Sequence, residues 1–203
     1  MQFFIIGTDT NVGKTIVSSW LCLHTAYDYF KMIQTGSING TDSDILKKLT
    51  YSKIHKEAYC YKEPLSPHLA AKLEQDEINI NNIILPNASN LVIEGAGGLL
   101  VPINQQYLLL DIISYLMLPV ILVTHSRLGT INHTLLTLQA LKSKGIEVVG
   151  VIVNGKPNQD NCDAITWYGK TTILAQFPFL STITKTTLRN IPLTQELKQL
   201  FMV

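Results

Sequence analysis

The chain has 203 residues, which is enough for one folded domain with a full core. Hydrophobic residues make up 46% of the sequence and charged residues 15%, a composition that excludes a disordered chain. The formal net charge of +1 gives no sign of a nucleic-acid-binding track or of attraction to an anionic membrane.

The chain begins directly in a short apolar run at residues 3–6, with no basic stretch before it. That run is too short for a secretory leader, and no stretch reaches the roughly 18 to 20 apolar residues that a membrane span needs. Cys22, Cys60 and Cys162 lie far apart, so neither a disulfide framework nor a zinc site is expected. We therefore expect a cytoplasmic protein that binds neither membranes nor nucleic acid.

Apolar runs alternate with helical patterns along the chain. Strands are expected at residues 3–6, 29–33, 91–93, 120–123, 148–153 and 172–177. Helices are expected at residues 13–27, 44–49, 67–73, 109–118 and 131–144. Residues 50–90 are expected to hold loops and short helices, and residues 193–201 a helix docked on the core.

Strands that are apolar on both faces are typical of a parallel sheet covered by helices. The alternation therefore predicts an α/β protein, a three-layer α/β/α sandwich with a mostly parallel central sheet. No internal repeat and no Pro/Gly/Ser linker divides the chain, so residues 1–203 are expected to form a single domain.

The glycine-rich segment GTDTNVGKT, at residues 7–15, lies between the first strand and the first helix. Backbone N–H groups and the helix dipole attract anions at such a place, so nucleotide phosphates are expected there. Lys14 would reach the β- and γ-phosphates, and the Thr15 hydroxyl would hold Mg²⁺. Five residues separate Gly7 from Gly13 where the usual motif has four, but the strand–loop–helix context still indicates a P-loop NTPase fold.

Carboxylates at two other places suit the same site. Glu94 ends the apolar run at residues 91–93 and precedes a glycine cluster. Ligands lie beyond the carboxyl ends of parallel strands, so Glu94 is expected near Lys14 and Thr15, where it could bind Mg²⁺. The cluster at residues 40–44 offers Asp42 and Asp44, although its residues also suit a helix N-cap. Spacing alone decides neither between these two roles nor between the two aspartates.

Five segments occur in an order that is typical of one enzyme family. They are GTDTNVGKT at residues 7–15, KMIQTG at 31–36, SPH at 66–68, EGAGG at 94–98 and GTINHTLLT at 129–137. Together they resemble the ATP-dependent dethiobiotin synthetases, over most of the chain from the first strand to about Asn154. EGAGG alone is shared by several amide-forming relatives, whereas its combination with the other segments is specific.

The resemblance implies a reaction in biotin biosynthesis. The family uses CO₂ and ATP to close a ureido ring on 7,8-diaminopelargonate. One amine captures CO₂ as a carbamate, the carbamate attacks the γ-phosphate to give a mixed anhydride, and the second amine displaces phosphate. Mg²⁺ and a homodimer with the substrate site at its interface are further expectations that follow from the family.

The resemblance also implies a role for individual residues. Lys14 and Lys31 are the expected catalytic residues, and the expected Mg²⁺ ligands are Thr15, Asp44 and Glu94, which favours Asp44 over Asp42. Expected nucleotide contacts are Asn11, Val12, Gly13, Lys14, Thr15, Ile16, Asp44, Glu94, Gly95, Ala96, Gly97, Asn154, Gly155, Pro178, Phe179 and Leu180. Expected substrate contacts are Thr10, Thr35, Gly129, Thr130, Ile131 and Asn132.

The chain departs from the family pattern at two positions near the site. Met32 stands where the family often has proline, and Asn11 stands where an acidic residue is common. The second change weakens any role for a carboxylate that contacts the substrate amine. His68 is expected to be structural, since a lone histidine is usually hydrogen-bonded within the protein.

A P-loop switch ATPase of the partitioning or septum-placement type is the alternative from another class. Such proteins share the fold but carry an extra lysine early in the loop, where this chain has Thr8 and Asp9. They also tend to use an amphipathic C-terminal helix on membranes, and residues 193–201 contain only one lysine. An amidotransferase-type synthase would need a glutaminase domain, for which 203 residues leave no room.

Overall fold

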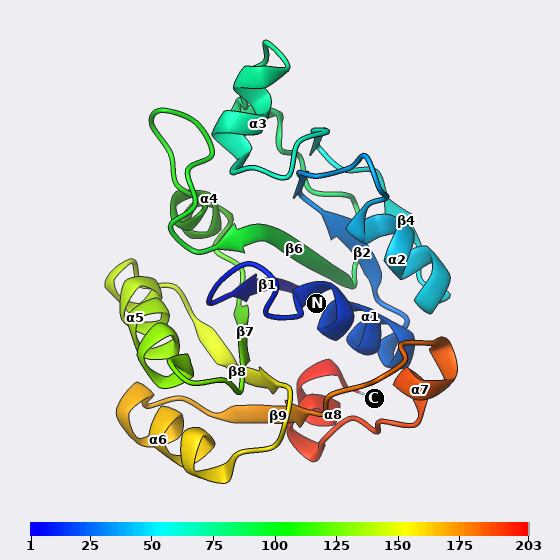
Figure 1. The fold of residues 1–203 in the computed structure, drawn as a ribbon, viewed down its shortest axis with the longest axis vertical. Coiled ribbons are helices and arrows are strands. Elements are labelled where there is room, and N and C mark those ends of the chain that lie inside the picture. The colour runs from blue at the N-terminus through cyan, green and yellow to red at the C-terminus, as the bar shows by residue number, and fades with distance from the viewer. Residues whose placement is uncertain (203) are drawn as a thin grey trace.

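The computed structural model describes residues 1–202, and its elements alternate between strands and helices along most of the chain (Figure 1). In chain order the elements are β1 (Gln2–Gly7), α1 (Lys14–Thr25), β2 (Asp28–Lys31), β3 (Ile33–Gln34), α2 (Asp42–Leu49), β4 (Ile54–His55), β5 (Tyr59–Cys60), α3 (Pro67–Leu73), the 3₁₀ turn η1 (Ile80–Asn82), β6 (Leu91–Gly98), α4 (Leu109–Leu116), β7 (Val120–His125), α5 (Thr130–Ser143), β8 (Val148–Asn154), α6 (Gln159–Gly169), β9 (Ile173–Phe177), α7 (Lys185–Arg189) and α8 (Gln195–Phe201).

Seven strands form the central sheet in the order β4-β2-β6-β1-β7-β8-β9. Every pairing within this sheet is parallel. The predicted fold class is therefore confirmed. Since all seven strands point the same way, the segments that follow β1, β2, β6, β7 and β8 emerge at one edge of the sheet, where ligands of such folds bind.

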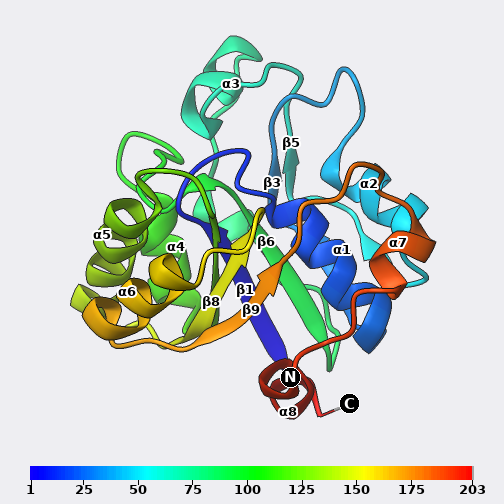
Figure 2. The same ribbon diagram turned by 60° about the horizontal axis from the view of Figure 1, so that its bottom comes forward.

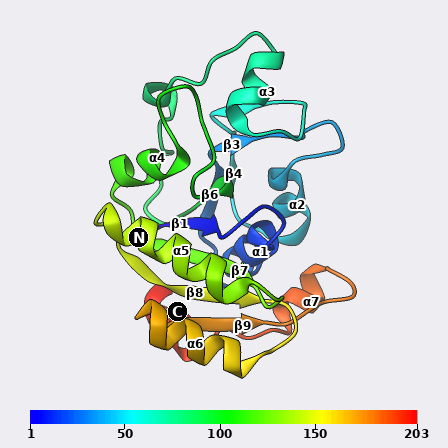
Figure 3. The same ribbon diagram turned by 60° about the vertical axis from the view of Figure 1, so that its left-hand side comes forward.

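Helices cover both faces of the sheet and make a three-layer molecule. Strand β1 shows why, because its successive side chains point to opposite faces. Phe4 and Ile6 pack in the apolar layer that α4, α5 and α6 cover, and Figure 3 turns these helices toward the viewer. Phe3 and Ile5 pack in the layer beneath α1, α2, α7 and α8.

The C-terminal helix α8 packs against the beginning of β1, as the sequence predicts for residues 193–201. The rings of Phe201 and Phe3 lie 4.8 Å apart between centroids, and the ring of Phe201 lies 5.1 Å from that of Tyr27. Figure 2 shows α8 below the N-terminal end of the sheet. Within residues 1–202, no helix combines the length and the apolar character needed to cross a membrane.

The second strand differs from its predicted span of residues 29–33. It leaves the central sheet after Lys31, and the chain continues into β3, which pairs with β5 in a separate two-stranded sheet. Met32 stands at the junction: its N–H donates to the Glu94 carbonyl, and its own carbonyl accepts from Ala58 and Tyr59. A proline at this position could not make the first of these bonds.

Two helices were not predicted. Helix α6 has polar residues at its start and the exposed aromatic side chains of Trp167 and Tyr168 near its end, so its apolar face consists of little more than Cys162 and Ile165. Helix α7 is five residues long, too short for a helical period to show. Strand β6 runs beyond its predicted end through the glycine cluster to Gly98.

Candidate nucleotide and substrate site

The segment at residues 7–15 forms a loop that connects β1 to α1 at the carboxyl edge of the sheet. Gly13 is the N-cap of α1, with φ of 98°, and no side chain caps the helix. A Cβ on Gly13 would lie 2.0 Å from the amide nitrogen of Asn154, so glycine is required there. Uncapped N–H groups at a helix start suit a phosphate.

Lys14 lies inside this loop and is almost fully buried, with 7% of the residue exposed. Its ammonium donates to the Asp9 carbonyl over 2.9 Å. Burial, together with the nearby positive charge of Lys31, lowers the pKa of Lys14 to about 8. A buried cation whose hydrogen bond within residues 1–202 goes to a neutral carbonyl is well placed to gain from the phosphate charges of a nucleotide.

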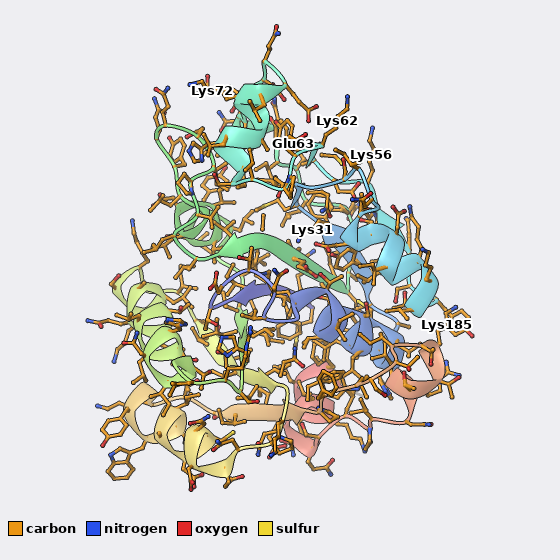
Figure 4. The ribbon with its side chains drawn as sticks, viewed as in Figure 1. Lys31, Lys56, Lys62, Glu63, Lys72 and Lys185 are labelled. Atoms are coloured by element: carbon orange, nitrogen blue, oxygen red, sulfur yellow. The ribbon has the colours of Figure 1, made fainter. Side chains whose placement is uncertain are left out.

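Lys31 and Glu94 are brought together by the parallel register of β2 and β6, in which they are direct partners. The Lys31 ammonium donates to Glu94 Oε1 and to the Gly95 carbonyl, each over 3.0 Å. Against the lowering effect of burial, the carboxylates of Glu94 and Asp42 raise the pKa of Lys31 above its ordinary value. Lys31 is therefore a fixed cation, and Figure 4 shows it in the interior, between β6 and α2.

Asp42 is the second carboxylate on Lys31. Helix α2 begins at this residue, and the Asp42 N–H donates to Gln34 Oε1 over 3.0 Å. One carboxylate oxygen of Asp42 lies 2.6 Å from the Lys31 ammonium. Burial acts to raise the pKa of Asp42, but Lys31 and the hydroxyl of Thr15 lower it below its ordinary value. The Asp42 carboxylate is thus held in its charged form beside Thr15.

Asp44, the aspartate that the family resemblance favours, lies elsewhere. Thr41 is the N-cap of α2, and Asp44 is the acidic partner of a capping box: its carboxylate accepts from the Thr41 N–H, and its own N–H donates to the Thr41 hydroxyl, each over 3.1 Å. The Asp44 carboxylate also pairs with Lys47 at the surface. Asp42 therefore lies on the cavity wall beside Lys31, whereas Asp44 caps the helix, and this geometry favours Asp42 over Asp44 as a cation ligand. The role of Asp44 in binding Mg²⁺ stays a prediction.

One cavity of about 790 Å³ gathers both expected catalytic lysines and much of the expected phosphate-binding loop. The expected residues on its wall are Thr10, Asn11, Gly13, Lys14, Thr15, Ile16, Lys31, Thr35, Glu94, Ala96 and Gly97. Asp42, Gln34, Ser66 and Pro67 complete much of the remaining wall. The hydroxyl of Ser66 is 3.1 Å from His68 Nδ1, which agrees with a structural role for this histidine.

The residues expected around the adenine lie together at the same edge of the sheet but outside this cavity. Asn154 is in register with Phe177, after which Pro178, Phe179 and Leu180 follow β9. The Asn154 amide donates to the Val12 carbonyl over 2.9 Å, so it contacts the phosphate loop. The Gly155 N–H donates to the Phe177 carbonyl. Gly95 is packed beneath the site by Phe4, Ile6 and Leu109.

The residues expected at the substrate carboxylate begin helix α5. Gly129 is its N-cap, with φ of 91° and no side-chain cap, so the N–H groups of Thr130, Ile131 and Asn132 begin an uncapped helix. The Thr130 side chain is buried, its hydroxyl pairs with that of Thr124 over 2.9 Å, and its N–H donates to the Arg127 carbonyl over 3.1 Å. A ligand at this helix start would therefore meet the N–H groups of Ile131 and Asn132. A second cavity of about 410 Å³ lies between the phosphate loop and α5.

The donor set fits Mg²⁺ bound together with a nucleotide. Two carboxylates, Asp42 and Glu94, and the Thr15 hydroxyl supply oxygen atoms, and Mg²⁺ in such sites takes its other ligands from phosphates and water. Across residues 1–202, no group of three or more His, Cys, Asp and Glu side chains is arranged to hold a metal ion by itself. The oxygen donors of Thr15, Asp42 and Glu94 therefore suit an Mg²⁺ ion that arrives with the nucleotide.

Sequence reasoning missed two further donors to Glu94. Ser18 and Tyr29 are fully buried, and their hydroxyls reach Glu94 Oε2. Their positions carried a signal: Ser18 lies three residues after Thr15 on one helix face, and Tyr29 lies two residues before Lys31 on one strand face. Likewise, the Thr-x-x-Asp spacing of Thr41 and Asp44 is that of a capping box, which leaves Asp42 free.

The chain is similar to known proteins over nearly its whole length. A family model described as an AAA domain matches residues 1–187. The ATP-dependent dethiobiotin synthetase BioD of Paramagnetospirillum magneticum is 44% identical over 93% of each chain. The protein of the same name from Neorickettsia sennetsu is 38% identical over 98% of this chain and 95% of its own.

A solved structure shares the fold at low sequence identity. A ParA family ATPase from Chlorobium tepidum aligns with a TM-score of 0.59 at 12% identity, over 98% of this chain and 90% of its own. At this identity the likeness concerns the fold alone. The sequence relatives, by contrast, are 38% and 44% identical to this chain over most of its length. This chain therefore belongs to the family of ATP-dependent dethiobiotin synthetases.

Proposed function

We propose that the protein is a dethiobiotin synthetase in biotin biosynthesis: an ATP-dependent ligase that closes a ureido ring on 7,8-diaminopelargonate with CO₂ and releases dethiobiotin, ADP and phosphate. One observation carries the proposal. A single cavity joins a phosphate loop with Lys14 to a second buried lysine, Lys31, held between two carboxylates. Relatives that match nearly the whole chain are named for this activity.

The residues suit a reaction that depends on positioning and charge neutralisation more than on a strong base. Lys14 and the free N–H groups at the start of α1 bind the β- and γ-phosphates. Lys31 faces the carbamate that forms when one amine of the substrate captures CO₂. The carbamate oxygen attacks the γ-phosphate, and the second amine then displaces phosphate from the mixed anhydride. Lys31 stabilises the negative charge of the carbamate and of the transferring phosphoryl group.

Thr15, Asp42 and Glu94 would hold the Mg²⁺ that accompanies ATP. When bound, this ion neutralises charge on the phosphates. The Lys31 ammonium bridges Asp42 and Glu94 in the structure and balances the charge of these two carboxylates. The arrangement therefore supports a site in which either the Lys31 ammonium or Mg²⁺ balances the charge of Asp42 and Glu94.

The substrate carboxylate is proposed to bind at the start of α5 in a homodimer. The uncapped N–H groups after Gly129 attract an anion. Leu100 and Leu136, beside the second cavity, and Leu128, in the loop before α5, expose large apolar surfaces that suit a second copy of the chain. We also propose that residues 1–203 form one domain. Three free cysteines support a reducing, cytoplasmic setting.

The test is phosphate release from MgATP and bicarbonate, with and without 7,8-diaminopelargonate, while dethiobiotin is followed by mass spectrometry. We expect phosphate release that depends on the diamine, with dethiobiotin formed in equal amount. ATP hydrolysis at the same rate with and without the diamine would instead favour a P-loop switch ATPase of the partitioning or septum-placement type, whose fold this chain shares. Absence of both reactions would point to another amine or acid substrate.

A further inference from the structure

The carboxylate of Glu94 is fully buried and accepts four hydrogen bonds. Its two oxygens face different surroundings. Oε1 accepts from Thr15 and Lys31, each over 3.0 Å, and both residues line the large cavity. Oε2 accepts from Ser18 over 2.8 Å and from Tyr29 over 3.1 Å, and neither of these residues lines it. The carboxylate thus has an outer oxygen and an inner oxygen.

Helix α1 and strand β2 each supply two of these four donors, one to the outer oxygen and one to the inner oxygen. Helix α1 gives Thr15 to the outer oxygen and Ser18, one turn later, to the inner one. Strand β2 gives Lys31 to the outer oxygen and Tyr29, two residues earlier on the same face, to the inner one. Both torsional freedom and sideways movement of the Glu94 carboxylate are therefore restricted from two sides.

The inner donors are neutral hydroxyls in a dry environment. Ser18 and Tyr29 are both fully buried, so water does not compete for their hydroxyls. An ionised carboxylate can only accept, hence Tyr29 and Ser18 must donate to it. Hydrogen bonds to a charged acceptor in such surroundings are strong and directional.

We propose that Ser18 and Tyr29 are positioning residues for the nucleotide site: by holding the inner oxygen of Glu94, they aim its outer oxygen at the cation that accompanies ATP. The inference rests on the proposed Mg²⁺-dependent function. Groups that hydrogen-bond a metal-binding carboxylate from behind fix its direction, and their loss typically costs about 10- to 100-fold in metal affinity or activity. Neither residue lines the cavity that contains Lys14 and Lys31.

The experiment measures how much Mg²⁺ tightens the binding of a non-hydrolysable ATP analogue, by calorimetry with excess Mg²⁺ and again with EDTA. We expect Tyr29→Phe and Ser18→Ala to reduce this Mg²⁺-dependent gain at least about tenfold. Affinity for the metal-free analogue should stay the same, since the phosphate loop is untouched. A merely structural role would weaken both affinities together, or neither.

Two matched variants serve as controls. Tyr27→Phe makes the same change two residues earlier, at a buried tyrosine that packs against Phe201. Ser19→Ala makes the same change one residue later, where the hydroxyl donates to the Thr15 carbonyl within its own helix. Thermal unfolding of every variant shows whether the fold is intact, and Ser18→Ala keeps the test informative if Tyr29→Phe unfolds.

The outcomes separate the inference from the function on which it rests. If the wild-type protein binds the analogue equally well with and without Mg²⁺, the proposed metal site fails and the positioning role fails with it. If Mg²⁺ tightens binding to the wild type, and to both Tyr29→Phe and Ser18→Ala by the same factor, the function stands and the positioning role is overturned.

Discussion

Two aspartates on the first turn of α2 serve different purposes, although only Ser43 separates them. Asp42 turns inward to Lys31, while Asp44 folds back on the helix cap. Spacing could not distinguish the two, and the family resemblance favoured Asp44. What decides between them is which residue is the N-cap, and that is a property of the local backbone. Thr41 takes the cap because its hydroxyl accepts from the Asp44 N–H.

Substitution of each aspartate by asparagine tests this assignment. Asp42→Asn should remove a carboxylate from the cation site and weaken Mg²⁺-dependent binding of an ATP analogue about tenfold or more. Asp44→Asn should leave that binding unchanged and lower the melting temperature slightly, since it weakens only the helix cap. Calorimetry and thermal unfolding of the two variants make the comparison. If Asp42→Asn and Asp44→Asn lost Mg²⁺-dependent binding equally, Asp44 would also have to be a ligand of the cation.

Lys31 is the counter-ion of Asp42 and Glu94, and its removal leaves the buried Glu94 carboxylate and the partly buried Asp42 carboxylate without their shared cation. Lys31→Ala should therefore unfold at a lower temperature than the wild type when EDTA is present. Added Mg²⁺ should raise the melting temperature of this variant more than that of the wild type, because the ion takes the place of the ammonium. Nucleotide binding should largely remain, while dethiobiotin formation stops.

Lys48→Ala, a change at an exposed lysine of α2, is the control for this experiment. It should respond to Mg²⁺ as the wild type does. Dethiobiotin formation by Lys31→Ala at the wild-type rate would remove this lysine from the mechanism. An equal response to Mg²⁺ in Lys31→Ala and the wild type would show that the carboxylate pair does not receive the ion.

A cluster of four threonine hydroxyls links the phosphate loop to strand β7 and helix α5. The Thr124 hydroxyl, at the end of β7, lies 3.1 Å from that of Thr8, 2.9 Å from that of Thr130 and 3.0 Å from that of Thr134. Thr134 donates to Thr124. One hydroxyl thus connects the beginning of the loop, the end of a central strand and the first turns of the helix proposed to bind the substrate carboxylate.

Thr124→Val keeps the shape of this side chain and removes its hydroxyl. Buried partners then lose an acceptor or donor, which typically costs about 1–3 kcal/mol of unfolding free energy. Urea unfolding should show a loss in this range. Thr137→Val, at a hydroxyl that donates to the His133 carbonyl of its own helix, should cost far less. No difference between the two variants would show that Thr124 has no joining role.

Helix α4 offers a prediction on pH. The Asp111 carboxylate accepts from the Leu108 N–H over 2.9 Å and pairs with Lys144 at the end of α5 over 3.1 Å. These contacts lower the pKa of Asp111 below its ordinary value. In the interval between the folded and unfolded pKa the unfolded chain binds more protons, so stability rises with pH there.

Asp111→Asn should therefore be less stable than the wild type above about pH 4, and this difference should disappear as the pH falls through the lowered pKa of the folded state. Unfolding free energies of the two proteins between neutral and acid pH measure it. Since the pair is largely exposed, the difference should also shrink in high salt. A difference that stays constant with pH would mean that Asp111 contributes through packing alone.

For the molecule as a whole, the alternation of apolar runs with helical patterns in the sequence was sufficient to predict a parallel sheet between two layers of helices. Strands such as β7 and β8 are apolar on both faces, and only helices on both sides can cover them. The hydrogen bonds from Ser18 and Tyr29 to Glu94 could not be predicted in this way, nor could the departure of the chain from the central sheet at Met32. Both depend on which strands are neighbours in the sheet. Parallel register, not sequence spacing, brings Lys31 to Glu94.

We expect two copies of the chain to complete the substrate site. Leu136 exposes 57% of its surface on α5 beside the second cavity. Leu136→Glu should place a charge in the proposed interface, where it would lack a partner. In sedimentation experiments the wild type should behave as a dimer of 22.6 kDa chains and the variant as a monomer. The variant should still bind ATP, since Leu136 does not line the cavity that contains Lys14, but should lose turnover of the diamine.

Trp167→Glu, which adds the same charge at an exposed aromatic residue of α6, is the matched control and should remain dimeric and active. The two variants separate a general effect of surface charge from loss of the partner chain. A wild-type protein that is monomeric and fully active would contradict the shared site, because the start of α5 would then have to receive the substrate carboxylate within its own chain. Dimerisation of Leu136→Glu with normal turnover would instead place the interface on another face, and the cavity between the phosphate loop and α5 would then have to be completed without Leu136.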